Sequence, residues 1–328
     1  MIGDYKISEL VSAEFSLSRW GDAKANIKLK RRKSMKKDKL SRRTFIRNTS
    51  LIAAGAVAGS FARSGNAAVP ANIERVVKKG RINQSVCKWC YRRQSLDELC
   101  AAAAKMGLKS VELLSGRDLL TVKKYGLVCA MVSSHGIAHG MNNKEYHADC
   151  IAKIRTGIDS TAEHKFPNVI TFSGNRAGIP DDVGLENAIV GLKQIVGYAE
   201  KKKVTICIEY LNSKVNHKGY MFDNMEWGVE LCKKVGSERL KILYDIYHVQ
   251  IMEGDIIRNI RDYHEYIGHY HTGGNPGRNE IDETQELYYP AIMRAIAETG
   301  FKGYVGQEFI PKRDPLTSLA QAAQICDV

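Results

Sequence analysis

Short runs of apolar and β-branched residues alternate with longer amphipathic stretches from residue 81 to residue 311. A continuous apolar run bounded by turn residues is typical of a strand that is buried on both faces, as in a parallel sheet. We therefore expect each short run to be such a strand. The predicted strands cover residues 81–89, 109–113, 127–132, 168–172, 204–209, 240–245, 266–271 and 303–308.

The stretches between these runs have apolar residues at three- and four-residue spacing, which predicts helices. Three of them are followed by Gly107, Gly126 or Gly300, and glycine is preferred just beyond a helix C-terminus. The predicted helices cover residues 96–106, 118–125, 144–164, 182–202, 224–235, 255–263 and 289–299. Residues 72–79 are expected to cap the floor of the sheet.

This alternation predicts an α/β fold, a single-domain (β/α)₈ TIM barrel over residues 69–328. Such barrels are typically about 250 residues long, and the region contains no internal repeat or linker. A doubly wound open sheet is the structural alternative. It would bind its ligand at one switch point and would not need ligand residues on four adjacent strands.

The last four predicted strands each end in a residue that can bind a hard metal ion. These residues are Glu209, Asp245, His271 and Glu308. The carboxyl ends of barrel strands meet at one mouth, where TIM-barrel enzymes carry out their chemistry. Three carboxylates and one imidazole favour Mn²⁺ or Mg²⁺, with Zn²⁺ and Co²⁺ as alternatives. One or two of the carboxylates could also act as acid or base, so the pattern predicts a metal-dependent enzyme.

Polar residues beyond these strand ends are candidates to contact a substrate. His248 is expected in the loop over the mouth, where it would bind a second metal or a substrate oxygen. Arg278 follows a glycine-rich loop and would pair with a carboxylate or a hydroxyl-rich substrate. Asn212 lies on the same rim, and His135 follows the third predicted strand.

The net charge of +13 is concentrated at the N-terminus. Residues 1–68 carry 15 Lys and Arg against 5 Asp and Glu, a net charge of +10, which leaves +3 for residues 69–328. The region predicted to fold as a barrel is therefore nearly neutral. A nucleic acid is not expected as a partner.

The basic leader, residues 1–68, is expected to contain a twin-arginine signal peptide. Residues 41–47 read SRRTFIR, and an apolar stretch at 51–61 and small residues ending at Ala68 follow. The apolar stretch is too short to span a bilayer core of about 30 Å, so no stable membrane anchor is predicted. Met35 would make a normal initiator for such a signal. We expect export by the twin-arginine translocation machinery to a periplasmic or other extracytoplasmic location.

Several of these segments resemble the hydroxypyruvate isomerase family of the xylose-isomerase-like barrel superfamily. The matching motifs are Glu209-x-x-Asn212 and residues 244–250 (YDIYHVQ), 275–280 (NPGRNE) and 306–311 (GQEFIP). The resemblance covers about residues 81–311. It implies metal binding and substrate binding by specific residues. It implies that the metal is held by Glu209, Asp245, His271 and Glu308. It also implies that Glu209 and Glu308 flank the substrate as proton donor and acceptor, and that His248 and Arg278 bind the substrate.

The reaction implied by the resemblance is abstraction of a proton α to a carbonyl, through an enediolate. Return of the proton to the neighbouring carbon would interconvert hydroxypyruvate and tartronate semialdehyde, or isomerise a small sugar. Return to the opposite face would epimerise a sugar, and loss of a β-substituent would make a keto-sugar lyase. His271 stands where sugar epimerases of the superfamily carry His and members acting on hydroxypyruvate often carry Gln. Together with export, this favours a carbohydrate derivative over a small hydroxy-keto acid.

Two functions of other classes are alternatives. In a zinc phosphodiesterase of the endonuclease IV type, His135, His139 and His269 would be additional zinc ligands. A non-catalytic sugar-binding barrel would tolerate the loss of Glu308, which the isomerase would not. The sequence permits a homo-oligomer and does not define the substrate.

Overall fold

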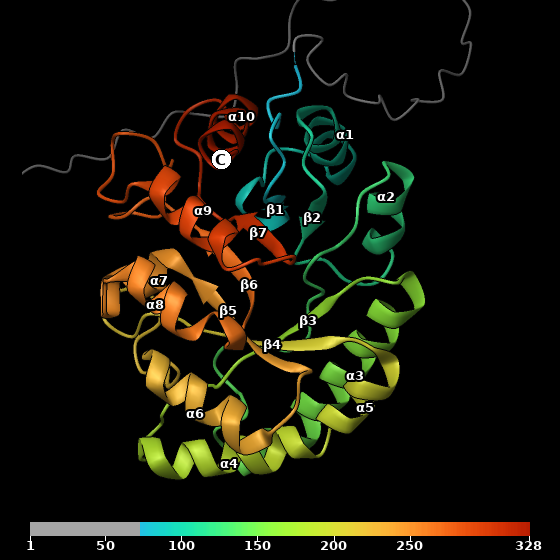
Figure 1. Cartoon of the computed structure of the whole chain (residues 1–328). Coiled ribbons are helices and arrows are strands. Elements are labelled where there is room, and N and C mark those ends of the chain that lie inside the picture. The colour runs from blue at the N-terminus through green and yellow to red at the C-terminus, as the bar shows by residue number, and fades with distance from the viewer. Residues whose placement is uncertain (1–72) are drawn as a thin grey trace, which may run out of the picture. The chain divides into compact units, whose positions relative to one another are not determined.

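The computed structural model describes residues 73–328, so the predicted leader and signal peptide lie outside the described residues. Seven strands form one parallel sheet in the order β2-β1-β7-β6-β5-β4-β3, with helices arranged around its outer face (Figure 1). The strands are β1 Asn83–Cys87, β2 Ser110–Glu112, β3 Asn168–Thr171, β4 Thr205–Glu209, β5 Leu240–Asp245, β6 Ile267–Thr272 and β7 Tyr304–Gln307. The predicted parallel barrel architecture is confirmed.

The eighth predicted strand, at residues 127–132, is not a regular strand. It lies between the two edge strands, where isolated parallel bridges join Val128 to β2 and Val132 to β3. Between them, the backbone of Ala130 bonds to side chains instead of to neighbouring strands: its N–H donates to Ser110 Oγ (2.9 Å), and its carbonyl accepts from Asn168 Nδ2 (2.8 Å). The barrel is therefore closed at this position by bridges and side chains.

The helices of the described residues are bounded by local capping signals. Ser95 and Glu98 form a reciprocal capping box at the start of the first helix, and Gly107 ends it in the left-handed conformation. The helices are α1 Leu96–Met106, α2 Asp118–Lys124, α3 His147–His164, α4 Asp181–Lys193, α5 Val196–Lys202, α6 Met225–Val235, α7 Ile246–Met252, α8 Ile256–Tyr263, α9 Tyr289–Glu298 and α10 Pro315–Ile325. None of the helices described is long and apolar enough to cross a membrane.

One predicted helix is divided in two, and two helices were not predicted. The single helix predicted at 182–202 is divided into α4 and α5. The N–H groups of Gln194 and Ile195 bond to carbonyls three residues earlier, which ends the α-helical pattern, and the side chain of Ile195 is buried at the break. Helix α7 follows β5 directly, where a loop was expected. The terminal helix α10 was not predicted, although Asp314 caps its first turn through the N–H of Thr317 (2.9 Å).

The floor of the barrel is closed by the C-terminus. Residues 73–79 run as an irregular segment into β1. The Asp327 carboxylate accepts hydrogen bonds from the backbone N–H groups of Lys78 (2.6 Å), Lys79 (2.8 Å) and Gly80 (2.8 Å). This carboxylate therefore ties the end of the chain to the segment that leads into the first strand.

Candidate active site

The four predicted ligands come together at the carboxyl ends of adjacent strands. Glu209 ends β4, Asp245 ends β5, His271 lies near the end of β6, and Glu308 follows β7. All four are buried, and one donor atom from each lies within 4.8 Å of the others. Such a spacing is compatible with one divalent ion bound by all four side chains.

Asp245 is held in place by the helix that follows it. Its Oδ1 accepts hydrogen bonds from the N–H groups of Tyr247 (2.9 Å) and His248 (3.3 Å) and so caps α7. Its Oδ2 is left facing the centre of the site, where Arg278 Nη2 donates to it (2.8 Å). The strand therefore positions this carboxylate, and the helix N-terminus fixes its rotamer.

Arg278 reaches the site from a tight loop after β6. The loop closes through the N–H of Gly274, which bonds to Asn279 O (2.9 Å). A side chain at position 274 would meet Glu280 O at 2.1 Å, so this turn requires glycine. The guanidinium is buried, forms ion pairs with Asp245 and Glu308, and faces the rings of Trp89 (5.5 Å) and Tyr247 (5.1 Å).

The carboxylates of the site strongly affect one another. Burial and the nearby charge of Glu308 raise the pKa of Asp245 to about 8, although Arg278 acts in the opposite direction. Burial also raises the pKa of Glu209, against the effect of His271. For Glu308, burial is outweighed by Arg278 and His271, which hold its pKa well below the usual value. The described cations of the site therefore do not fully compensate three buried carboxylates, and a divalent ion would.

The state of His271 supports a metal at this position. Its Nε2 lies 2.7 Å from Glu112 Oε1, so this nitrogen carries a proton that it donates to the carboxylate. Its Nδ1 lies 2.7 Å from Glu308 Oε2 and 3.5 Å from Glu209 Oε1. Two carboxylates around this nitrogen need a positive charge between them: without a metal, a proton on Nδ1 supplies it, and a bound metal ion would take the place of that proton. The residues present therefore fit a divalent metal.

His248 and Asn212 lie together behind Asp245. His248 is in the first turn of α7, which corrects the prediction that it lies in a loop; the cause is that Asp245 caps a helix at once. The N–H of Asn212 donates to His248 Nδ1 (3.2 Å), and Arg278 contacts the other ring nitrogen. Burial and the charge of Arg278 hold the pKa of His248 well below its usual value. The imidazole is therefore neutral.

A cavity of about 470 Å³ opens over these residues and is walled mainly by the first half of the barrel. His135 is part of this wall: its Nε2 is 2.8 Å from Thr171 Oγ1, and its ring packs edge-on against Phe172. The lining residues are Trp89, Leu113, Ser133, Ser134, His135, Ile137, Ile170, Phe172, Glu209, Leu211, His217, Arg278 and Glu308. Of the four residues predicted to bind substrate, His135 and Arg278 thus line the cavity, and His248 and Asn212 lie beneath it.

Trp89 and Glu112 also belong to the site and were not predicted from the sequence. Trp89 donates from its indole Nε1 to Glu308 Oε1 (2.6 Å), which is possible because residues Lys88–Cys90 form a 3₁₀ turn and do not continue β1. Glu112 accepts hydrogen bonds from His269 Nε2 (2.8 Å) and His271. One signal was available for Glu112, a carboxylate at the end of an apolar strand, as at Glu209, Asp245 and Glu308.

The additional zinc ligands of the phosphodiesterase alternative do not come together. His269 bonds to Glu112 inside the barrel, whereas His135 bonds to Thr171 in the cavity wall. Among the described residues, no group with metal-ligand spacing contains His135, His139 or His269. The eight cysteines, which all lie in the described part of the chain, are buried as free thiols.

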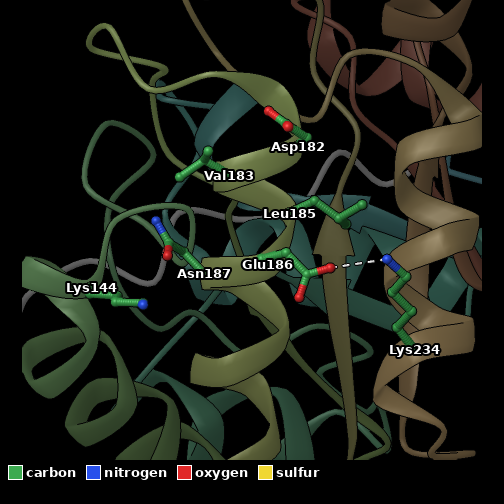
Figure 2. A pocket seen from close by; sticks show the side chains of 7 residues that line it. All are labelled: Lys144, Asp182, Val183, Leu185, Glu186, Asn187 and Lys234. Carbon is green, nitrogen blue, oxygen red and sulfur yellow. Dashed lines mark hydrogen bonds and ion pairs between the residues drawn. The ribbon is translucent and has the colours of Figure 1, made fainter.

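A second hollow of about 450 Å³ lies on the outer surface, over α4 and α6 (Figure 2). Its lining is Lys144, Asp182, Val183, Leu185, Glu186, Asn187 and Lys234. An exposed ion pair between Glu186 and Lys234 (3.0 Å) crosses it. None of the four predicted ligands lines this hollow.

The fold and the site together define a parallel α/β barrel with an acidic, histidine-containing centre at the carboxyl ends of its strands. Residues 100–326 match the family described as "Xylose isomerase-like TIM barrel". The chain belongs to this family.

Sequence identity to individual relatives is low. A human putative hydroxypyruvate isomerase is 30% identical over 138 residues, which are 42% of this chain and about half (48%) of that protein. The mouse putative hydroxypyruvate isomerase is 24% identical over 255 residues, covering 77% of this chain and 88% of that one. Among solved structures, a 3-keto-D-glucoside 4-epimerase from E. coli matches with a TM-score of 0.64 at 17% identity, over 74% of this chain and 98% of that chain. At this identity the structural match supports the fold alone.

Proposed function

We propose that the protein is a metal-dependent isomerase that moves a proton α to the carbonyl group of a hydroxy-carbonyl substrate. The observation that carries this proposal is the convergence of Glu209, Asp245, His271 and Glu308, with donor atoms within 4.8 Å, at the base of a 470 Å³ cavity. Curated relatives named hydroxypyruvate isomerase support the isomerase class.

Glu209, Asp245, His271 and Glu308 would hold the ion, with Mn²⁺ or Mg²⁺ best suited to this oxygen-rich set. When bound, a divalent ion supplies polarisation of the carbonyl and hydroxyl oxygens of the substrate. Zn²⁺ and Co²⁺ would also be accepted by three carboxylates and an imidazole. The ion would also neutralise the charge of the buried carboxylates.

Glu209 and Glu308 are the proton-transferring residues in this proposal. Both carboxylates line the cavity, so both can contact a substrate carbon there. Their environments differ: burial raises the pKa of Glu209, whereas Arg278 and His271 lower that of Glu308. Two carboxyl groups with separated pKa values can act as acid and base in one turnover.

The remaining residues would bind and orient the substrate. Arg278 offers N–H donors at the cavity floor, and His135 faces the substrate from the wall, while Asn212 and His248 support the position of Arg278. Trp89 holds Glu308 through its indole N–H and covers the guanidinium of Arg278. The enediolate formed by proton removal would be stabilised by the positive charge of Arg278.

Epimerisation of a carbohydrate on the same site is the second candidate. One observation favours it over a three-carbon acid: the cavity wall is apolar and aromatic with serine hydroxyls, and its only described cation, Arg278, is already paired with Asp245 and Glu308. A sugar ring uses apolar faces and hydroxyl contacts, whereas a free carboxylate needs an unpaired cation.

Isotope exchange tests the proposal. The full chain, loaded with Mn²⁺, is incubated in D₂O with hydroxypyruvate, free ketoses or keto-glycosides, and exchange of substrate C–H for C–D is followed by NMR. Exchange on one substrate class is expected, and the class that exchanges separates the hydroxy-acid isomerase from the sugar epimerase. Glu186→Gln, in the outer hollow, is the matched carboxylate control. If metal is bound and no substrate exchanges, the proton-transfer proposal fails.

We also propose that the chain is exported, on the basis of the twin-arginine motif at residues 41–47. Twin-arginine transport carries folded proteins, which suits a barrel with eight buried free cysteines. Replacement of Arg42 and Arg43 by Lys should retain the full-length chain in the cytoplasm. Fractionation and detection of the processed chain would measure this, and equal processing of both forms would contradict the proposal.

A further inference from the structure

A second polar cluster lies inside the barrel, next to the predicted metal site. It consists of Glu112 on β2, His269 and His271 on β6 and Cys87 on β1, and all four side chains are completely buried. Glu112 Oε1 accepts from His269 Nε2 (2.8 Å) and from His271 Nε2 (2.7 Å). Cys87 Sγ is 3.6 Å from the same oxygen and 3.7 Å from His271 Nε2. One carboxylate oxygen thus contacts three side chains from two other strands.

The barrel interior is shaped to admit this carboxylate. A side chain at Gly306 on β7 would lie 2.7 Å from Glu112 Oε1 and 2.9 Å from His271 Cδ2. Only glycine therefore leaves room for Glu112 and His271 to meet. The fit has a cost, because Glu112 Oε2 and His269 Nδ1 are buried without hydrogen bonds. Burial of a carboxylate with an unbonded oxygen lowers the stability of the fold, so stability alone does not explain Glu112.

We propose that Glu112 is a positioning residue that prepares His271 to bind the metal through Nδ1. The hydrogen bond at Nε2 keeps a proton on that nitrogen, so a bound metal would replace a proton at Nδ1, the nitrogen that lies beside Glu209 and Glu308. A carboxylate behind a ligating imidazole also makes the imidazole a stronger donor. This inference rests on the metal dependence in the proposed function, and it assigns a task to a residue outside the metal ligands.

His269 completes the arrangement from the same strand. Residues two apart on a strand point to the same face, so His269 and His271 both face Glu112. The bond from His269 fixes the position of Oε1, because one oxygen receives two converging N–H donors. Loss of this donor should therefore loosen Glu112 without removing the carboxylate from His271.

The test compares metal binding by the full chain and by Glu112→Ala and Glu112→Gln. Mn²⁺ dissociation constants are measured by calorimetry, the Co²⁺ form by its absorption spectrum, and the metal-free proteins by thermal unfolding. Glu112→Ala is expected to weaken Mn²⁺ binding about 10- to 100-fold and to change the Co²⁺ spectrum. Glu112→Gln should recover most of the affinity, because an amide oxygen still accepts both N–H groups. Glu186→Gln is the control and should leave both readouts unchanged.

Two results would overturn the inference. One is a wild-type dissociation constant and Co²⁺ spectrum in Glu112→Ala, since a purely structural residue would change only thermal unfolding. The other needs no variant: ¹⁵N NMR of the wild-type protein with diamagnetic Zn²⁺ should place the metal on His271 Nδ1 with a proton on Nε2, and the reverse assignment contradicts the proposal. If the wild-type protein binds no divalent ion, the metal dependence in the proposed function fails instead.

Discussion

The two halves of the barrel contribute different things to the site. Strands β4 to β7 are linked to one another by backbone ladders, and their ends carry Glu209, Asp245, His271 and Glu308. In the other half, β1 pairs with β2 and β3 pairs with β4, but the segment 127–132 between β2 and β3 is not a regular strand. Most of the cavity wall comes from residues at or just beyond the carboxyl ends of these segments, and this half also supplies Glu112 and Trp89. Metal binding thus belongs mainly to the regular half, and substrate contact and ligand support to the irregular half.

This difference follows from the precision that each task needs. Four ligands must agree within a few tenths of an ångström, and neighbouring paired strands fix their relative positions. A cavity wall tolerates a looser backbone, because it contacts the substrate through several interchangeable apolar and hydroxyl groups. Glu112 is the exception, since it reaches across the barrel interior and joins the two halves through β6.

The largest effect is expected from the regular half. Glu308→Gln removes a proton-transferring carboxylate while keeping its shape, so turnover should fall at least 10³-fold with the metal still bound. Substrate C–H exchange in D₂O and metal content per chain are the measurements. Turnover within 10-fold of wild type would remove Glu308 from the chemistry and favour a binding protein.

Removal of the metal is the next largest expected effect. Dialysis against EDTA should abolish exchange and lower the unfolding free energy by about 2.7 kcal/mol relative to protein at 100 times the dissociation constant of the ion. Denaturant unfolding with and without Mn²⁺ measures the change. Asp245→Asn should be insensitive to Mn²⁺ in the same assay, and an equal response would show that the ion binds elsewhere.

Loss of the Asp327 carboxylate at the barrel floor should lower the free energy of unfolding by about 2 kcal/mol. Burial opposes the ionisation of Asp327, but N–H donors from residues 78–80 outweigh it and lower its pKa. A carboxylate whose pKa is lower when folded stabilises the protein above its unfolded pKa of about 3.9, and that contribution disappears as the pH falls through the folded pKa.

The variant Asp327→Asn should therefore lose about 2 kcal/mol of unfolding free energy at pH 7. The difference from wild type should shrink between about pH 4 and pH 2, as the wild-type carboxylate becomes protonated. Urea titrations over this range are the measurement. A constant difference at every pH would mean that the bonds of Asp327 do not depend on its charge.

The smallest expected effect lies in the cavity wall. His135→Ala removes one polar contact that faces the substrate, so KM should rise about fivefold, equivalent to about 1 kcal/mol, with kcat and Mn²⁺ affinity nearly unchanged. Steady-state kinetics measure KM and kcat, and calorimetry measures the Mn²⁺ affinity. A loss of Mn²⁺ affinity in this variant would contradict the division of tasks between the halves.

The regular half was the more predictable one from sequence. The carboxyl end of a buried strand can be recognised in a sequence, so the strands ending at Glu209, Asp245 and His271 identified neighbouring side chains without any knowledge of the packing. The loop around Arg278 was placed through its glycines and its motif. These signals lie within short sequence segments, and the barrel brings the ends of the strands, with their side chains, close together.

Glu112 was missed because a strand boundary was misplaced, whereas Trp89 and segment 127–132 depended on tertiary structure. Predicted strand 109–113 extended one residue beyond the true end of β2 at Glu112, so this carboxylate was not recognised as a strand-end residue. Trp89 was assigned to a strand, but a 3₁₀ turn directs its indole to Glu308. In segment 127–132, Ser110 and Asn168 satisfy the backbone of Ala130, and no pattern within the segment itself contains that information.

The bond from Trp89 to Glu308 also equips the site with an optical reporter. Indole emission responds to the charge beside its N–H, and Glu308 is the carboxylate that a bound ion would neutralise. The described residues contain two tryptophans, and Trp227 donates to Asp181 O on the outside of the barrel. In a Trp20→Phe, Trp227→Phe background, Trp89 would be the sole tryptophan of the chain, and its fluorescence in the purified protein would record the arrival and departure of the ion in real time.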